Sequence, residues 1–171
     1  MSSWKTIQPE ALTDNPFHLI GKDWMLVTAK NKEQVNTMTA SWGGVGVMWG
    51  KSVAFLVIRP QRFTKKLIDT SDTLSLSFFT EEYRDVLKYC GSVSGRDEDK
   101  IGHTKLTVEE INGTPVFKEA RMNLVCQKLY AQPMSRDFLL DSTIPDAWYK
   151  DGDYHTLYIA EITNVLLRDE E

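Results

Sequence analysis

The order of strand-like and helical segments is the feature that most constrains the fold of this chain. Five segments have the apolar or alternating pattern of strands, and they lie at residues 24–30, 52–58, 73–80, 123–132 and 156–167. Between them, residues 61–69 and 81–91 have helical spacing, and Gly91 would end the second helix. Because strands and helices do not alternate regularly, the pattern argues against a doubly wound parallel sheet. It predicts a mainly β fold with helices, a decorated β-barrel.

The composition is that of an ordinary globular protein. The chain has 171 residues, of which 42% are apolar and 26% charged, and this length predicts a single domain over residues 1–171. The net charge of −4 gives no overall attraction to nucleic acid or to an anionic membrane. Two distant cysteines, no apolar leader and no apolar run of spanning length lead us to expect a cytoplasmic protein with reduced thiols.

A row of hydroxyl groups stands in the sequence TMTASW, which is followed by glycines at positions 43, 44 and 46. Hydroxyl and apolar side chains alternate along this segment, whose residues are Thr37, Met38, Thr39, Ala40, Ser41 and Trp42. In an extended segment the three hydroxyls share one face, and hydroxyls both donate and accept hydrogen bonds. Such a face suits the edge of a planar ligand, while the glycines permit close approach of the backbone. The alternative is a barrel strand with a solvated face, which the pattern alone favours.

The segment RPQRFT, residues 59–64, ends one predicted strand and opens the next predicted helix. A helix start presents unpaired N–H groups and a partial positive charge, and it therefore attracts anions. Arg59, Arg62 and the hydroxyl of Thr64 add donors here, and each charge-assisted bond contributes roughly 1.5–3 kcal/mol. The alternative is a capped helix flanked by two surface arginines.

A second polar loop, SVSGRDEDK, covers residues 92–100 and contains Ser94, Gly95, Arg96 and Lys100. We expect that its basic side chains can close over the same anion as RPQRFT, although the sequence does not show that the two segments meet. The alternative is a solvated turn whose cations pair with the acidic residues of the same loop.

The usual catalytic motifs are missing from the sequence. His18, His103 and His155 lack the spacing of metal ligands, and we expect no metal site. No GxSxG nucleophile motif, GxGxxG loop or Walker A sequence occurs. The residues therefore favour a site for a planar, phosphorylated ligand, and they do not identify that ligand.

Five stretches of the chain, taken together, resemble the flavin reductase-like proteins, and within them the flavoredoxin-type branch. The stretches are NTMTASWGGVGVMW, VIRPQRFTKKLI, LSFFTEEYRDVLKYCGSVSGRDEDKI, PVFKEARMNLVCQKLYAQ and DYHTLYIAEI, and they occur in the family order. The resemblance implies an FMN-binding split β-barrel. It also implies a homodimer with the flavin near the subunit interface.

The resemblance further assigns residues to the FMN site. The hydroxyl-rich segment would run along the isoalloxazine and ribityl chain, residues 59–64 would hold the phosphate, and the loop 92–100 would close on the flavin. The cofactor-binding residues expected on this basis are Thr37, Met38, Thr39, Ala40, Ser41, Trp42, Arg59, Gln61, Arg62, Thr64, Ser94, Gly95, Arg96 and Lys100. Tyr154 and His155 would reach the flavin from the same or the partner chain, and His155 is the one catalytic candidate.

The function implied by the resemblance is an FMN-binding oxidoreductase. It would take hydride from NAD(P)H and pass electrons to free flavin or to a redox partner. Because we find no separate nicotinamide motif, a flavoredoxin-like electron carrier without NAD(P)H oxidation is the first alternative, and a non-catalytic flavin-binding protein is the second. The five tryptophans offer surface for the dimer or, alternatively, belong to the core.

Overall fold

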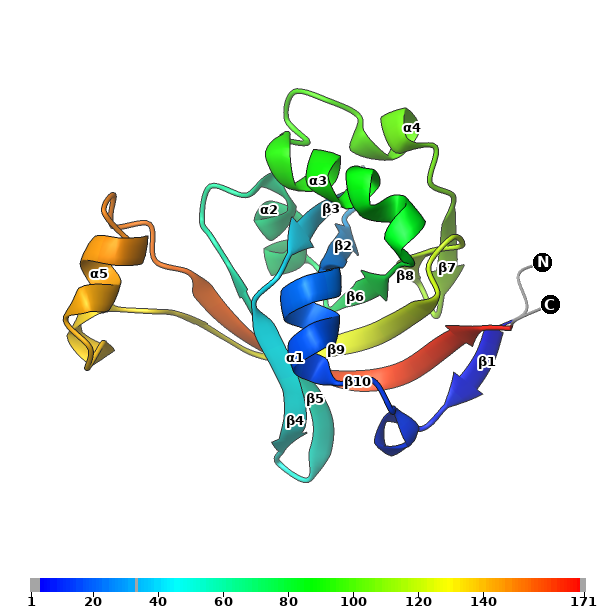
Figure 1. Cartoon of the computed structure of the whole chain (residues 1–171), viewed down its shortest axis with the longest axis horizontal. Coiled ribbons are helices and arrows are strands. Elements are labelled where there is room, and N and C mark those ends of the chain that lie inside the picture. Colours follow the sequence, from blue (N-terminus) through cyan, green and yellow to red (C-terminus); the bar gives the residue numbers. More distant parts are fainter. Residues whose placement is uncertain (1–3, 33, 170–171) are drawn as a thin grey trace.

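The computed structural model describes residues 4–32 and 34–169, and its main element is an eight-stranded antiparallel sheet (Figure 1). The strands of this sheet are β1 (Trp4–Ile7), β2 (Met25–Lys30), β3 (Val35–Ala40), β4 (Gly43–Met48), β5 (Lys51–Ile58), β6 (Thr73–Phe78), β9 (Met122–Pro133) and β10 (Thr156–Arg168). A separate two-stranded sheet consists of β7 (Val108–Ile111) and β8 (Thr114–Phe117). The five predicted strands are confirmed as β2, β5, β6, β9 and β10.

The large sheet curves into a barrel that is not closed. Its strand order is β3-β2-β6-β9-β10-β5-β4, and β1 pairs with β10 beside this path. β3 and β4 therefore lie at opposite edges and, within the described part of the chain, do not pair with each other. Only Ser41 and Trp42 separate these two strands in the sequence. The predicted split β-barrel is confirmed, and the TMTASW segment lies at the split.

Apolar side chains from several strands fill the barrel. Met25 and Val27 of β2, Leu76 of β6, Leu124 of β9 and Tyr158 of β10 are at most 2% exposed and belong to one cluster. Burying a side chain of this size stabilises a fold by about 1.5–3 kcal/mol. The packed barrel is therefore a firm support for the segments at its two edges.

Three helices gather at the end of the barrel that carries β3 (Figure 1). They are α2 (Phe63–Thr70), α3 (Arg84–Ser92), which follows the 3₁₀ turn η3 (Glu81–Tyr83), and α4 (Lys100–Thr104). α2 buries Leu67 and Ile68, and α3 buries Leu87 and Cys90. All three helices contact β3, so they cover the open edge of the sheet.

Two further segments lie outside the sheet. The 3₁₀ turn η1 (Pro9–Ala11), the helix α1 (Pro16–His18) and the π-helical turn η2 (Leu19–Asp23) connect β1 to β2, and α1 contacts β4. Between β9 and β10, residues 134–155 form an arm that projects from the barrel (Figure 1). The arm contains the 3₁₀ turn η4 (Arg136–Phe138) and the helix α5 (Thr143–Trp148).

Two helix boundaries differ from the prediction. The helix expected over residues 61–69 starts at Phe63, because the residues before it form a turn in which Arg62 N donates to Arg59 O (3.2 Å). The second helix does not end at Gly91 but continues one residue further, since the chain leaves α3 in an extended conformation. A left-handed glycine cap is therefore not used there.

The glycine run was not predicted as a strand, yet it forms β4. At Gly43, which has φ +142°, a Cβ atom would lie 2.3 Å from the carbonyl oxygen of Phe55 on β5. Only glycine permits this close approach of two backbones. The strands β1, β7 and β8 were also not predicted, because each has only four residues and so offers too short a pattern to recognise.

Candidate functional site

The three hydroxyls of the TMTASW segment have different surroundings. The Thr37 side chain is fully buried, and its hydroxyl donates to Val27 O (3.1 Å). The Thr39 hydroxyl donates to Leu87 O of α3 (2.5 Å). Ser41 lies beyond the end of the strand, is half-buried and lines a cavity. The protein itself therefore holds the two hydroxyls within the strand, while that of Ser41 faces open space.

Two of the three apolar side chains of the same segment, those of Met38 and Ala40, lie on the barrel side. Met38 is buried in the main core cluster, and Ala40 packs against it. The Trp42 ring is 39% exposed. A ligand beside β3 would therefore meet Ser41, Trp42 and the backbone of this strand rather than the side chains of Met38 or Ala40.

The start of α2 contains a buried hydroxyl without a partner. The Thr64 side chain is 1% exposed, and its Oγ1 atom forms no hydrogen bond within the described residues. It lies in the first turn of the helix, where unpaired backbone N–H groups carry a partial positive charge. A buried polar group without a partner costs about 1–3 kcal/mol. A phosphate oxygen at this helix start would be a suitable acceptor.

The two predicted basic segments meet at this point. Arg96 Nη1 donates to Gln61 O (3.0 Å), and the Arg96 guanidinium lies 5.3 Å from the centre of the Phe63 ring. Arg62 Nη1 donates to Gly91 O (3.1 Å) at the end of α3. The structure therefore brings together the residues that the sequence left separate.

The loop 92–100 also presses closely against β3. A Cβ atom on Gly95 would lie 2.0 Å from Nδ2 of Asn36, so a larger residue here would force the Asn36 side chain to move. The Asn36 side chain is 4% exposed, and its Nδ2 atom is the second buried polar atom without a partner in the described chain. Ser94 Oγ accepts a hydrogen bond from Arg96 N (3.2 Å), which shapes the loop.

Three cations gather here without a carboxylate partner. Lys100 is 3% exposed, and its Nζ donates to Thr37 O (3.0 Å) and Cys90 O (2.8 Å). Burial and, next, the charge of Arg62 lower the pKa of Lys100 to about 8. Burial also lowers the pKa of Arg62. Across residues 4–32 and 34–169, neither these two side chains nor Arg96 forms an ion pair.

Arg59 and Gln61 face the arm. Arg59 donates to Asp153 Oδ2 (2.7 Å) and to Trp148 O (2.9 Å), and its guanidinium lies 5.2 Å from the centre of the Tyr149 ring. Gln61 Nε2 donates to the same carboxylate oxygen of Asp153 (2.8 Å). The expected contact of these two side chains with a phosphate stays a prediction, and in the structure both are engaged by the arm.

An aromatic group lies where the arm meets the β3–β4 link. His155 is 6% exposed, and its Nδ1 atom lies 2.7 Å from the Tyr149 hydroxyl. The centre of the Trp42 ring is 5.2 Å from that of His155 and 4.9 Å from that of Trp148. Burial, followed by the charge of Arg59, lowers the pKa of His155 to about 4. The imidazole is therefore neutral at neutral pH.

No group of three or more His, Cys, Asp or Glu side chains among the described residues is arranged to hold a metal ion. No helix in the described chain combines the length and apolar character needed to cross a bilayer. Cys90 and Cys126 are both buried and free, as expected.

Comparison with protein families decides the relationship. The model of the flavin reductase like domain matches residues 17–171, which is most of the chain. The chain belongs to the flavin reductase-like family. A comparison with curated protein sequences gives no match. The prediction of one domain over residues 1–171 stays a prediction.

Solved structures share the flavin reductase-like fold. An FMN-binding domain of a flavin reductases-like enzyme from Shewanella baltica OS155 superposes with a TM-score of 0.70 at 16% identity, covering 98% of this chain and 78% of the other. Flavoredoxin from Methanosarcina acetivorans gives 0.67 at 20% identity, covering 86% and 69%. The styrene monooxygenase flavin reductase from Pseudomonas putida S12 gives 0.61 at 14% identity, covering 84% and 77%. At these identities the likeness establishes the fold.

Several residues of the candidate site were not predicted from the sequence. They are Asn36, Trp148, Tyr149 and Asp153. Asn36 directly precedes the TMTASW segment, so its position in the sequence could have indicated that it belongs to the same site. The arm residues that contact Arg59 lie 89 to 94 positions from it in the chain. No local pattern links residues so far apart.

Proposed function

We propose that this chain binds FMN and acts as an oxidoreductase. The observation that carries the proposal is the buried, unpartnered Thr64 hydroxyl at the start of α2. Arg62 and Arg96 donate to backbone oxygens around this helix start, and Lys100 shares the acceptor Cys90 O with Arg62. A phosphate monoester carries about −1.5 to −2 charge at pH 7 and presents three strong acceptor oxygens. It would accept from Thr64 and the helix N–H groups, and the cations would balance its charge.

The rest of the flavin would lie along β3 towards the link to β4. Ser41 and Trp42 would meet it there, and Asn36 Nδ2 is a buried donor on the same strand. The loop that contains Ser94 and Gly95 would close the site from the other side. When bound, FMN supplies two-electron chemistry, and the protein supplies position and electrostatics. His155, being neutral, would orient a ligand rather than supply a proton.

The proposed reaction is hydride transfer from NAD(P)H to the flavin, followed by transfer to free flavin or to a redox partner. The second candidate is a flavoredoxin-like electron carrier that another protein reduces, and its support is the lack of a separate nicotinamide motif. A non-catalytic flavin-binding protein is the third. Stopped-flow mixing of the FMN-loaded protein with NADH or NADPH separates these. Fast bleaching of the flavin absorbance excludes the pure carrier, and no bleaching excludes the reductase.

Removing the Thr64 hydroxyl tests the proposed FMN site. We expect Thr64→Val to weaken FMN binding about tenfold, because one charge-assisted hydrogen bond is lost. Thr70→Val is the matched control, since Thr70 lies on the same helix and donates to its own backbone at Lys66 O and Leu67 O. Binding is followed by quenching of FMN fluorescence. Unchanged affinity in Thr64→Val would place the phosphate elsewhere.

The proposal includes a homodimer. Its support is the exposure of three of the five tryptophans, with Trp42 at 39%, Trp49 at 57% and Trp148 at 53%. Large aromatic side chains are enriched at protein interfaces. Sedimentation at the monomer mass of 19.6 kDa would contradict the dimer. A redox-protein acceptor and a cytoplasmic location stay predictions.

A further inference from the structure

A small cavity lies where the end of η2, the segment after β6 and the start of α3 meet. Its volume is about 280 Å³, just below the range of about 300–1,000 Å³ for sites of drug-sized ligands. Its apolar lining consists of Phe79 and Leu87, which are at most 4% exposed and belong to one buried cluster. The cavity therefore suits a small molecule with a short apolar group.

The polar lining of this cavity carries both signs of charge. Among the described residues it consists of Asp23, Thr80, Glu81, Arg84 and Arg121. Two of these side chains are anionic and two are cationic, so their formal charges sum to zero. A simple ion of either sign would be attracted by one pair and repelled by the other. A neutral molecule with separate positive and negative groups can pair with both.

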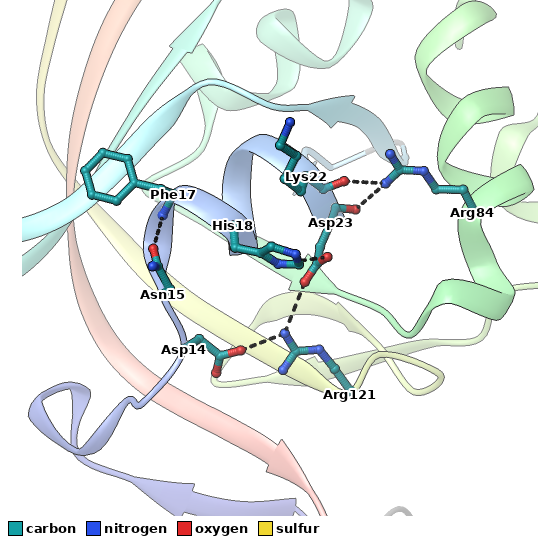
Figure 2. A network of polar contacts seen from close by, with 8 residues as sticks. All are labelled: Asp14, Asn15, Phe17, His18, Lys22, Asp23, Arg84 and Arg121. Atoms are coloured by element: carbon teal, nitrogen blue, oxygen red, sulfur yellow. Dashed lines mark hydrogen bonds and ion pairs between the residues drawn. The ribbon is translucent and has the colours of Figure 1, made fainter.

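Asp23 and Arg121 already have partners within the protein. Arg121 Nη2 lies 3.6 Å from Asp23 Oδ2 and 2.8 Å from Asp14 Oδ1 (Figure 2). The other carboxylate oxygen of Asp23 lies 3.3 Å from His18 Nδ1. These contacts compensate the two charges and fix one wall of the cavity. A ligand would therefore find its charged partners in the rest of the lining.

Arg84 offers a fixed pair of donors. Its Nη1 atom donates to Lys22 O (2.6 Å) and Asp23 O (3.0 Å), and its guanidinium carbon lies 3.5 Å from the centre of the Trp24 ring (Figure 2). Across residues 4–32 and 34–169, Arg84 forms no ion pair, and its Nε and Nη2 atoms donate no hydrogen bond. These two atoms form the edge of a guanidinium that binds both oxygens of a carboxylate.

Glu81 is an anion without a partner on the same cavity. It is exposed and lies three residues before Arg84, yet the two side chains form no ion pair, and Glu81 pairs with no other described residue. The neighbouring Thr80 hydroxyl donates to Glu82 Oε1 (2.9 Å), so its oxygen can still accept a hydrogen bond. The lining thus presents two acceptors for a cationic group beside the donors of Arg84.

We propose that this cavity binds a free α-amino acid with an aliphatic side chain. The carboxylate would accept from Nε and Nη2 of Arg84. The ammonium group would donate to Glu81 and Thr80, and the side chain would pack on Phe79 and Leu87. None of these residues belongs to the proposed FMN site, so the proposal does not rest on FMN binding.

Three ligands that share one side chain separate the roles of the two charges. L-Leucine carries both groups, 4-methylpentanoate lacks the ammonium group, and 3-methylbutylamine lacks the carboxylate. We expect leucine to bind the full chain with a Kd of about 1 mM or below, and at least about tenfold more tightly than either other ligand. Ligand-observed NMR titration measures the three affinities. Weaker leucine binding, or a preference below about tenfold over either analogue, would overturn the proposal.

Glu81→Gln removes the expected partner of the ammonium group and keeps the size of the side chain. We expect it to weaken leucine binding about tenfold or more. Glu82→Gln is the matched control, because Glu82 is the exposed neighbour, does not line the cavity, and as glutamine keeps an oxygen that accepts from Thr80. Unchanged leucine affinity in Glu81→Gln, or an equal loss in Glu82→Gln, would contradict the assignment.

Arg84→Lys keeps the positive charge and removes the two-donor edge. We expect leucine binding to weaken about tenfold or more, and retained affinity in the folded variant would overturn the carboxylate position. Circular dichroism checks the fold, because Arg84 also holds Lys22 and Asp23. Should this variant fail to fold, Glu81→Gln and the ligand series still decide.

Titration of the same samples with FMN keeps the two proposals apart. We expect leucine to bind with and without saturating FMN, and FMN affinity to be equal in Glu81→Gln and the wild type. Loss of FMN binding alone would reject the proposed function and leave the amino-acid site standing. Displacement of leucine by FMN would overturn the amino-acid site, since the cavity would then belong to the flavin.

Discussion

Arginines serve opposite purposes in two regions of this molecule. In the segment between β1 and β2, Asp14 and Asp23 both pair with Arg121 (Figure 2). At the start of α2, the described hydrogen bonds donated by the Arg62 and Arg96 side chains all go to backbone carbonyl oxygens. If the proposed phosphate site is right, the partner of a cation, rather than its presence in the sequence, separates an arginine that holds the fold from one that binds an anion.

The energetic difference follows from burial. The side chains of the Arg121 ion pairs are about one-third exposed, and each such pair contributes up to about 1 kcal/mol. The Lys100 charge beside Arg62 is buried, and burying a charge without an opposite charge is unfavourable. A bound phosphate would offset this unfavourable term. The phosphate region is therefore expected to gain the most from its ligand.

The largest expected effect is on the unpaired cations. We expect the double substitution Arg62→Ala and Arg96→Ala to weaken FMN binding about a hundredfold or more, because two charge-assisted contacts are lost. Quenching of FMN fluorescence gives the affinity, and circular dichroism checks that the helices remain. Arg59→Ala is the comparison, since Arg59 is engaged by Asp153 and should change affinity far less. An equal loss of FMN affinity in Arg59→Ala would mean that Arg59 also contacts the phosphate.

Arg121→Ala should lower the stability of the fold and leave FMN affinity nearly unchanged. We expect the free energy of unfolding to fall by about 1–2 kcal/mol, because Asp14 and Asp23 lose their shared partner. FMN affinity should stay within about twofold of the wild type, since this region is remote from α2 in sequence and contacts. Urea unfolding and FMN titration measure the two quantities. A large loss of FMN affinity would show that the two regions are coupled.

Lys100 should link FMN binding to pH. Its pKa of about 8 in the free protein is lowered by burial, and a nearby phosphate would raise it. The bound form therefore holds the proton at pH values where the free form loses it, so affinity falls as pH rises above 8. We expect a decrease of about tenfold between pH 7 and pH 9.5. Fluorescence titration should show this slope in the wild type and a flat profile in Lys100→Met.

The stability of the free protein should respond to Lys100 with the opposite sign. The unfolded chain keeps this proton up to the usual pKa of 10.5, whereas the folded protein loses it near 8. Between these values the unfolded state holds more protons, so the contribution of this group to stability rises with pH. Urea unfolding across that range, compared with Lys100→Met, measures the difference.

The smallest effect is expected at the hydroxyl that first suggested a ligand. Thr39 donates to Leu87 O, so Thr39→Val should lower the free energy of unfolding by about 1 kcal/mol. FMN affinity should change by less than about twofold, because the hydroxyl is occupied within the protein. A tenfold weaker affinity would mean that Thr39 leaves Leu87 to contact the ligand.

Much of the fold could be predicted from periodicity alone. β5, β9 and β10 have long apolar or alternating patterns, and these patterns survive in the structure because the strands pack on the barrel core. β4 could not be predicted, since glycine is a poor strand former and the strand depends on its pairing with β5. Tertiary pairing, rather than local preference, makes that strand.

The candidate site was predictable in its segments but not in its side-chain directions. Periodicity placed Thr37 and Thr39 on one face, yet it could not show that the hydroxyls of this face donate to the backbone of β2 and of α3. Likewise, Arg59 and Arg62 are three residues apart and reach opposite neighbours, the arm and the end of α3. Such contacts depend on how distant segments pack, which a single sequence does not encode locally.

The link of Ser41 and Trp42 sets the width of the split. It joins the two edges of an open sheet, and the three steps from Ala40 to Gly43 reach about 10 Å at most. The link therefore limits the distance between the ends of β3 and β4, because these two edges cannot separate by more than the length of the chain that joins them. One residue inserted after Trp42 would lengthen this link and allow a wider aperture, while the strand pairing of the sheet would stay intact.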